Sequence, residues 1–271
     1  MDKRILKDRF GLTERQLGRI LVARSRKEIK SLALYRKVPD EYSFAAIGDT
    51  HLCSIQEKLR ELHTFYDLCR KRKISDVFHA GDVVAGQGIY SGQEYEVNTF
   101  GADNQVAYVV DKYPKVKGIT THFITGNHDY SFYKMAGVDV GLKIGEQRED
   151  MNFLGAFRGE VFYNGVKLIQ LVHPDGGMPY ALSYRAQKYV EQVASGSKPR
   201  VLLVGHLHTQ YNFLYRNINV FGVGCWEGQT TFLARKGINP VIGGWFITVK
   251  FGKDKKKSIV SFVSEFVPFY L

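Results

Sequence analysis

Short apolar runs alternate with amphipathic stretches through the middle of the chain. Each run is bounded by glycine or polar residues and is too short for a helix, so it predicts a buried strand. Between the runs, apolar residues recur at helical spacing, as at Leu59, Leu62 and Phe65. The predicted strands are residues 42–47, 77–80, 121–125 and 201–204, and the predicted helices are residues 55–73, 102–110 and 182–193.

Other predicted strands follow one another directly. Residues 161–163 and 167–172 flank Asn164-Gly165, a dipeptide typical of a tight hairpin turn. Further short strands are expected at residues 211–215, 220–223, 245–251 and 258–262. Strand–helix alternation followed by consecutive strands predicts an α/β fold with mixed β-sheets.

Residues 1–40 differ from the rest of the chain in charge. They carry twelve Lys and Arg against five Asp and Glu, which is +7 of the total net charge of +11. A short helix, Gly11 and a capping box that begins at Thr13 form the local pattern of a helix-turn-helix. In that interpretation the second helix enters a DNA groove, and the candidate nucleic-acid contacts are Arg15, Arg19 and Arg24. The alternative is a basic helical extension packed on the main domain, and the pattern leaves both open.

Composition excludes several classes of protein. With 44% hydrophobic and 24% charged residues, the chain has the make-up of a soluble globular protein. Its apolar runs are far shorter than the ~20 residues of a membrane helix, and its start lacks the apolar segment of a secretory signal. Three cysteines are too few for a disulfide framework. We therefore expect a cytoplasmic protein that is not in a membrane.

Polar segments rich in histidine and aspartate follow five of the apolar runs. In α/β folds, side chains at the carboxyl ends of strands meet in one crevice. Residues two apart at a strand end are expected to project to the same side, which would pair Asp49 with His51 and His206 with His208. The segments are 48–51 (Gly-Asp-Thr-His), 81–82 (Gly-Asp), 126–129 (Gly-Asn-His-Asp), His173 and 205–208 (Gly-His-Leu-His).

Such a cluster predicts a metal centre, because dehydrated imidazoles and carboxylates without a cation would cost several kcal/mol. The mixed nitrogen and oxygen ligands suit divalent ions such as Mn, Fe, Zn, Co or Ni. Seven ligands are too many for one ion and suit two ions that share a carboxylate. Two divalent ions and two aspartates leave a positive centre, which would attract a phosphate ester and activate a bridging hydroxide for attack on phosphorus.

The ordered set of five segments resembles the calcineurin-like metallophosphoesterase superfamily over roughly residues 42–230. The resemblance implies a four-layer αββα sandwich of two mixed β-sheets flanked by helices. It implies a first ion held by Asp49, His51 and His208, a second held by Asn127, His173 and His206, and Asp82 shared between them. It also makes His128 the catalytic residue beside the substrate phosphate, with Asp129 orienting His128.

We thus expect a basic helical segment at residues 1–40 and a phosphoesterase domain at residues 41–271. The loops 86–101 and 178–184 are expected to line the site.

The first hypothesis for the function is a phosphodiesterase acting on nucleic acid, DNA or RNA, in the manner of a nuclease. The alternative is a phosphatase or phosphodiesterase for a small molecule or a phosphoprotein. A binding scaffold would lack ligand residues, and none is missing. His79 and Cys53 are expected to pack in the core, and His63 to lie on the surface.

Overall fold

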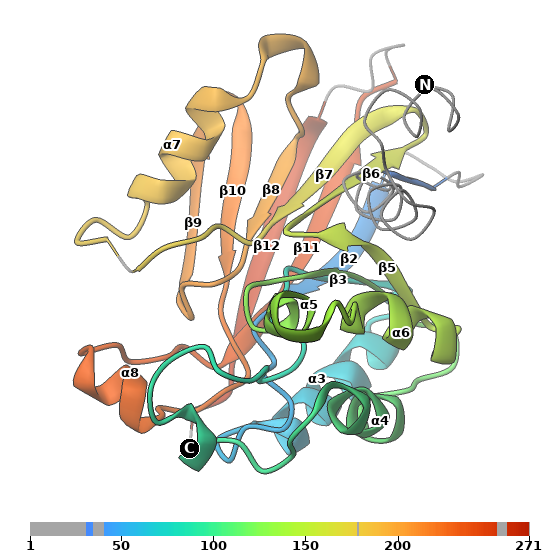
Figure 1. The fold of residues 1–271 in the computed structure, drawn as a ribbon. Coiled ribbons are helices and arrows are strands. Elements are labelled where there is room, and N and C mark those ends of the chain that lie inside the picture. Colours follow the sequence, from blue (N-terminus) through green and yellow to red (C-terminus); the bar gives the residue numbers. More distant parts are fainter. Residues whose placement is uncertain (1–30, 35–40, 178, 254–258, 271) are drawn as a thin grey trace, which may run out of the picture.

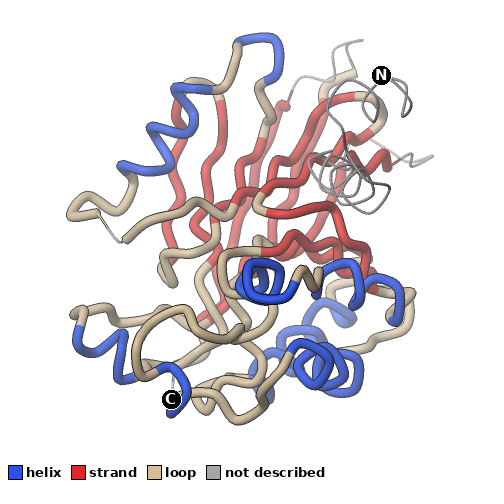
Figure 2. The backbone as a smooth tube through the Cα atoms, viewed as in Figure 1, coloured by secondary structure: helices blue, strands red, loops and turns tan. Residues whose placement is uncertain are grey.

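Two six-stranded β-sheets packed face to face form the body of the protein, with helices on the outer faces (Figures 1 and 2). The computed structural model describes residues 31–34, 41–177, 179–253 and 259–270. The expected helix-turn-helix, with Arg15, Arg19 and Arg24, lies outside the described residues.

The described residues form a series of strands and α-helices along the chain. The strands are β1 (Ser31–Leu34), β2 (Glu41–Ile47), β3 (Asp76–His79), β4 (Thr120–Thr125), β5 (Met151–Ala156), β6 (Arg158–Tyr163), β7 (Val166–Val172), β8 (Val201–Val204), β9 (Gln210–Tyr215), β10 (Ile218–Val223), β11 (Gly243–Phe251) and β12 (Ile259–Pro268). The α-helices are α3 (Leu59–Lys71), α4 (Ala102–Lys112), α5 (Asp129–Ala136), α6 (Val140–Gln147), α7 (Tyr184–Gln192) and α8 (Thr231–Arg235).

Both sheets are mixed. Sheet A has the strand order β1-β6-β7-β8-β10-β9, and sheet B has the order β12-β11-β2-β3-β4-β5. In sheet B, β2, β3, β4 and β5 run parallel, whereas β11 and β12 are antiparallel additions. In sheet A, β7, β8 and β10 run parallel. The parallel strands in each sheet end at a common edge, and the polar segments follow them there.

Three apolar clusters produce the layers. One joins the outer face of sheet B to α3, α4 and α6 through side chains such as Ile47 and Phe65. The second lies between the sheets and includes Phe44 and Ile169. The third packs Val190 of α7 on the outer face of sheet A. Phe44 and Ile47 of β2 face different clusters, because side chains three apart on a strand project to opposite faces. The four-layer sandwich predicted from the sequence is confirmed.

Several predicted elements are confirmed and others need correction. The β6–β7 hairpin turns at Asn164 and Gly165, whose φ angles of 47° and 81° are the left-handed values that this turn type requires. Residues 31–34 were predicted to be helical, and this is wrong: they form β1, which pairs in parallel with β6. The predicted helix 55–73 begins only at Leu59. Helices α5 and α6, of eight residues each, were not predicted because they are too short to show a clear helical period.

Across the described residues, no helix combines the length and the apolar character needed to cross a membrane.

Candidate metal centre

The polar segments that follow β2, β3, β4, β7 and β8 meet at one place, held by backbone hydrogen bonds between the loops. The amide of Asp49 donates to the carbonyl of Gly81 at 2.8 Å, and the amide of His51 donates to the carbonyl of Asp82 at 3.1 Å. Thr50 reinforces this contact, because its hydroxyl donates to the carbonyl of Val83 at 2.9 Å. The first two segments therefore run side by side past the ends of their strands.

Five of the seven predicted ligands have left-handed backbone. The φ angles are 52° at Asp49, 42° at His51, 56° at Asp82, 79° at His206 and 48° at His208. Such values are uncommon for residues other than glycine and concentrate at functional sites, where the surrounding structure has to hold them. The expectation that strand alternation projects these side chains is therefore wrong. The sharply turned loops beyond the strands aim them instead.

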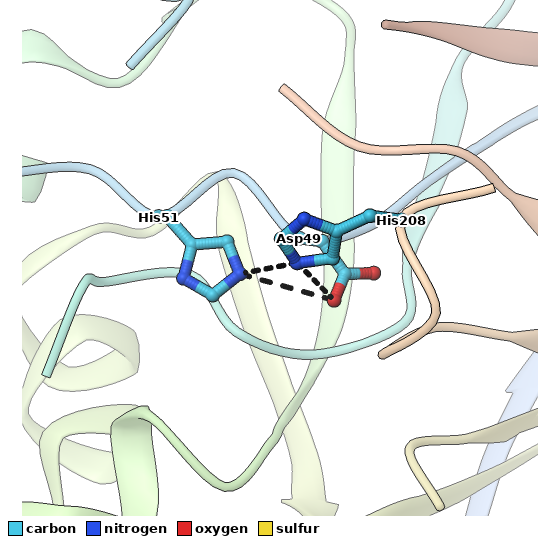
Figure 3. A group of neighbouring side chains, drawn as sticks. All are labelled: Asp49, His51 and His208. Carbon is cyan, nitrogen blue, oxygen red and sulfur yellow. Dashed lines mark hydrogen bonds and ion pairs between the residues drawn. The ribbon is translucent and has the colours of Figure 1, made fainter. Parts of the chain in front are cut away.

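Asp49, His51 and His208 form the first group of candidate ligands (Figure 3). The Nε2 atoms of the two histidines lie 3.0 Å apart, and Asp49 Oδ1 lies 3.9 Å from that of His51 and 3.6 Å from that of His208. Ligand atoms about 2.1 Å from a shared ion lie roughly 3.0–3.4 Å from one another. All three residues are buried. The two histidine nitrogens have the spacing of ligands to one divalent ion, and Asp49 lies a few tenths of an ångström beyond it.

Asp82, His173 and His206 form the second group. His173 Nε2 lies 3.1 Å from Asp82 Oδ2 and 3.1 Å from the amide oxygen of Asn127. The pair His206 and His208, expected to act together on one side, is thus divided between the two groups. Asn127 accompanies the second group, as the resemblance implies.

Asp82 lies between the groups. Its Oδ2 is 3.1 Å from His173 Nε2 and 3.7 Å from His51 Nε2. The same carboxylate accepts a hydrogen bond from the amide of His128 at Oδ1. A carboxylate that faces both groups has the position of a shared ligand in a two-metal centre.

Each imidazole has two ring nitrogens, and the one that donates a hydrogen bond to the protein leaves the other to face the candidate site. The nitrogen that points away from the site is called the outer nitrogen. His173 Nδ1 donates to the carbonyl of Ala80 at 2.8 Å, and His206 Nε2 donates to the carbonyl of Gly176 at 2.6 Å. Both rings are therefore oriented so that the other nitrogen faces the candidate site, and that nitrogen binds an ion only when it carries no proton. For His51 and His208, by contrast, Nδ1 is buried with no hydrogen-bond partner among the described residues. The donor set thus fits a pair of divalent ions, although two outer nitrogens have no direct partner.

Burial dominates the electrostatics of the cluster. It raises the pKa of Asp49 well above the usual range and lowers the pKa of His208 to about 3. For Asp82, burial is outweighed by the imidazoles of His173 and His128, and the pKa lies well below the usual range. For His173, burial is outweighed by the Asp82 carboxylate 3.1 Å away, and the pKa is raised to about 10. Asp82 and His173 therefore form an ion pair in the absence of metal, and a bound cation would relieve the cost of ionising Asp49.

His128 lies beside both groups and lines the adjoining pocket. Its Nδ1 donates to the carbonyl of Ala85 at 2.6 Å, which leaves Nε2 as the nitrogen free for a substrate. Asp129 was predicted to orient His128, and the structure contradicts this. The Asp129 carboxylate instead accepts hydrogen bonds from the amides of Gly126, Val83 and Val84 at 2.9–3.1 Å. It fixes the backbone of the second and third segments and does not bond to the imidazole.

A pocket of about 790 Å³ opens beside the two groups. Its lining includes Tyr90 and Tyr180, from the two loops that were predicted to line the site, and Phe232 on α8, which was not predicted. The rings of Tyr90 and Phe232 stack with centroids 4.1 Å apart. Glu96 holds this pair, because it accepts hydrogen bonds from the Tyr90 hydroxyl at 2.5 Å and from the Phe232 amide at 3.1 Å.

Comparison with known families agrees with this geometry. Residues 42–210 match the profile of the family described as calcineurin-like phosphoesterase, which is more than half of the chain. The chain belongs to the calcineurin-like phosphoesterase family. The resemblance drawn from the motifs is confirmed, and with it the expectation of a metal-dependent phosphoester hydrolase.

Curated relatives of this phosphoesterase include the DNA polymerase II small subunits of Methanocaldococcus jannaschii and Halobacterium salinarum. Each is 23% identical, over 76% and 72% of the chain respectively. The alignments cover 42% and 46% of those proteins, so the chain spans less than half the length of the curated relatives it matches.

Similar solved structures include an archaeal phosphodiesterase, with 12% identity and a TM-score of 0.47 over 83% of this chain and 100% of that one. Another is a zinc complex of Vps29 from Entamoeba histolytica, with 14% identity and a TM-score of 0.41 over 84% of this chain and 100% of that one.

Two residues near the candidate ligands have contacts that the sequence analysis did not predict. His79 was expected only to pack in the core, and Glu227 was not singled out. His79 is buried, as expected, but it also links two loops: its Nδ1 accepts from the amide of Gly81 at 3.2 Å and its Nε2 donates to the Thr50 hydroxyl at 3.0 Å. Glu227 is buried next to His208. A signal for Glu227 was present, because Gly224-Cys225-Trp226-Glu227 follows the apolar strand β10 in the same way as the five recognised segments. His63 is exposed and Cys53 is buried, as predicted.

Substitution of Gly126 tests whether the two groups bind ions. A Cβ atom at this position would lie 2.2 Å from Asp82 Oδ1 and 2.6 Å from His173 Nε2, so both side chains would have to move. We expect Gly126→Ala to weaken Mn²⁺ binding at least about 10-fold, measured by titration of metal-free protein in competition with a chelator.

Gly196→Ala is the matched control, because a Cβ there meets no atom within 4 Å. Equal Mn²⁺ affinity and stoichiometry in both variants would show that the Asp82–His173 region does not hold metal.

Proposed function

We propose that this chain is a two-metal phosphodiesterase that acts on nucleic acid and admits a single-stranded end to its pocket. The observation that carries the proposal is that Tyr90, Tyr180 and Phe232 line the same pocket as candidate metal ligands such as Asp82 and His206. Aromatic side chains stack on unpaired bases with little dependence on sequence. The volume of about 790 Å³ is within the range of pockets that enclose most of a small ligand.

In this proposal the chain's residues position the phosphate diester. When bound, two divalent ions, Mn first among the candidates, would lower the pKa of a water and stabilise the negative charge on the phosphoryl oxygens in the transition state. Asn127 is a neutral ligand, so it adds no negative charge that would repel the substrate. His128 presents Nε2 to the pocket, where it hydrogen-bonds to the phosphate or protonates the leaving oxygen.

Charge and relatives support a nucleic-acid substrate. The chain carries a net charge of +11, and most of it lies in residues 1–40. A basic segment of this kind attracts phosphate backbones. The curated relatives are named as DNA polymerase II small subunits.

A small-molecule phosphoester is the second candidate function. Among the described residues that line the pocket, Lys236 is the one Lys or Arg side chain. A channel that tracks a long phosphate backbone usually has a row of cations. The pocket itself therefore also suits a compact ester with an apolar group.

Activity on a panel of substrates distinguishes the candidates. We expect Mn²⁺-loaded protein to cleave a single-stranded oligonucleotide faster than the same sequence as a duplex. Stacking on the aromatic side chains that line the pocket needs unpaired bases. It should also cleave bis-p-nitrophenyl phosphate faster than p-nitrophenyl phosphate. The Asp82→Ala variant, which lacks the carboxylate that faces both groups, is the control for activity that does not come from the candidate metal centre. Hydrolysis of the monoester alone would exclude the nuclease proposal and favour the second candidate.

His128→Ala should leave the metal ligands in place and remove the residue next to the substrate. We expect kcat on the diester to fall about 10²–10⁴-fold, with unchanged Mn²⁺ stoichiometry by elemental analysis. Loss of bound metal in this variant would contradict the assigned role.

The proposed nucleic-acid contacts at Arg15, Arg19 and Arg24 are tested by changing all three to Gln. Each lost phosphate contact lowers the salt dependence of binding, so the slope of log affinity against log salt should become shallower by about 2–3. The measurement is fluorescence anisotropy with labelled DNA across a salt series.

The control carries the same loss of charge on α3, with the exposed Arg60, Arg70 and Lys71 changed to Gln. If both triple variants change the slope equally, the charge of the chain as a whole attracts DNA and the helix-turn-helix interpretation fails.

A further inference from the structure

One imidazole of the first group faces a buried carboxylate that the resemblance does not assign. His208 directs Nε2 toward His51 and Asp49, and its Nδ1 lies 4.0 Å from Glu227 Oε2. Glu227 is only 7% exposed and also lines the pocket. No described residue forms a hydrogen bond with His208 Nδ1.

The other imidazoles show what an occupied outer nitrogen looks like here. His173, His206 and His128 each donate one ring proton to a backbone carbonyl, at 2.6–2.8 Å. Such bonds fix the tautomer and the ring orientation of a histidine that binds metal. His208 has no carbonyl in that position, and the buried carboxylate of Glu227 takes the carbonyl's place at a longer distance.

The backbone ties Glu227 to the loops that carry the first group. The amide of Trp226 donates to the carbonyl of Asp49 at 2.9 Å, and Glu227 forms an isolated β-bridge with Glu57. The Glu227 carboxylate also has a hydrogen bond with the side chain of Ser54. Glu227 therefore moves with the segment that presents Asp49 and is held at a fixed place behind His208.

We propose that Glu227 is a positioning residue: its carboxylate accepts the Nδ1 proton of His208 and holds that ring with Nε2 toward the first ion. This inference rests on the proposed metal ligation by His208. The 4.0 Å separation must shorten by about 1 Å for a charge-assisted bond, which a small rotation of either side chain provides. Burial raises the pKa of Glu227 to about 8, against the effect of the Ser54 bond, and bound divalent cations act in the opposite direction.

The experiment compares Mn²⁺ binding by full-length wild type, Glu227→Ala and Glu227→Gln, all first freed of metal. Loss of the acceptor should weaken one of two Mn²⁺ sites about 10–100-fold in Glu227→Ala. The amide oxygen of Gln still accepts the Nδ1 proton, so Glu227→Gln should stay within about 3-fold of wild type. The readouts are calorimetric titration and the Mn²⁺ electron paramagnetic resonance spectrum.

Glu57→Ala is the matched control. Glu57 is the bridge partner of Glu227, and its carboxylate bonds to the Cys53 amide and the Tyr108 hydroxyl instead of a candidate ligand. This variant should retain both Mn²⁺ affinities. Thermal unfolding of the metal-free variants identifies any that fail to fold.

Two results would overturn the inference. Unchanged affinities in Glu227→Ala would show that His208 needs no acceptor, and equal weakening in the Gln and Ala variants would make Glu227 a ligand or a charge instead of an acceptor. If the Ala variant does not fold, ¹⁵N-histidine spectra of the Zn²⁺-loaded wild type and Gln variant decide. They must show a protonated Nδ1 at His208, and a protonated Nε2 would refute the proposal. A protein that binds both ions in this way yet cleaves no nucleic acid would refute only the proposed function.

Discussion

The cost of burying carboxylates and imidazoles together is the constraint on which this structure depends. Asp49, Asp82 and His173 are almost fully buried, and His173 Nε2 lies 3.1 Å from Asp82 Oδ2. Removing such groups from water costs several kcal/mol unless partners or cations replace it. The loops meet this constraint by backbone hydrogen bonds. The amide of His206 donates one bifurcated hydrogen bond to both oxygens of Asp49, and Asp129 accepts three from amides in or next to the second and third segments.

The layered fold makes such an arrangement possible. Parallel strands in two sheets end at one edge, so loops from distant parts of the sequence meet there. Apolar clusters lie on both faces of each sheet and pack the sheets against each other and against the helices. The left-handed backbone at residues such as Asp82 and His206 is strained, and the rigid sheets below oppose its relaxation. A rigid base and strained loops together give a preorganised site.

The sequence predicted the fold class and the residues that gather, because both depend on local signals. Apolar runs mark the strands, and polar segments at their ends mark the site. The direction of the candidate ligand side chains was not predictable. It depends on positive φ angles, and the residue types at these positions do not indicate such angles. Asp129 shows the same limit. Its position in the motif suggested a contact with its neighbour His128, but three backbone amides bind its carboxylate instead. Glu227 was not predicted because the segment that follows β10 is not one of the five recognised motifs.

The hydrogen bond between His206 Nε2 and the carbonyl of Gly176 links the metal centre to the outer wall of the pocket. Arg185 of α7 holds the same loop through the carbonyls of Asp175 and Gly177, at 2.6 Å and 2.7 Å. Tyr180, further along this loop, is fully exposed at the rim. One loop therefore carries both the hydrogen-bond acceptor of a candidate metal ligand and part of the pocket lining, so the side chain of Arg185 contributes to the orientation of the His206 ring from outside the cluster.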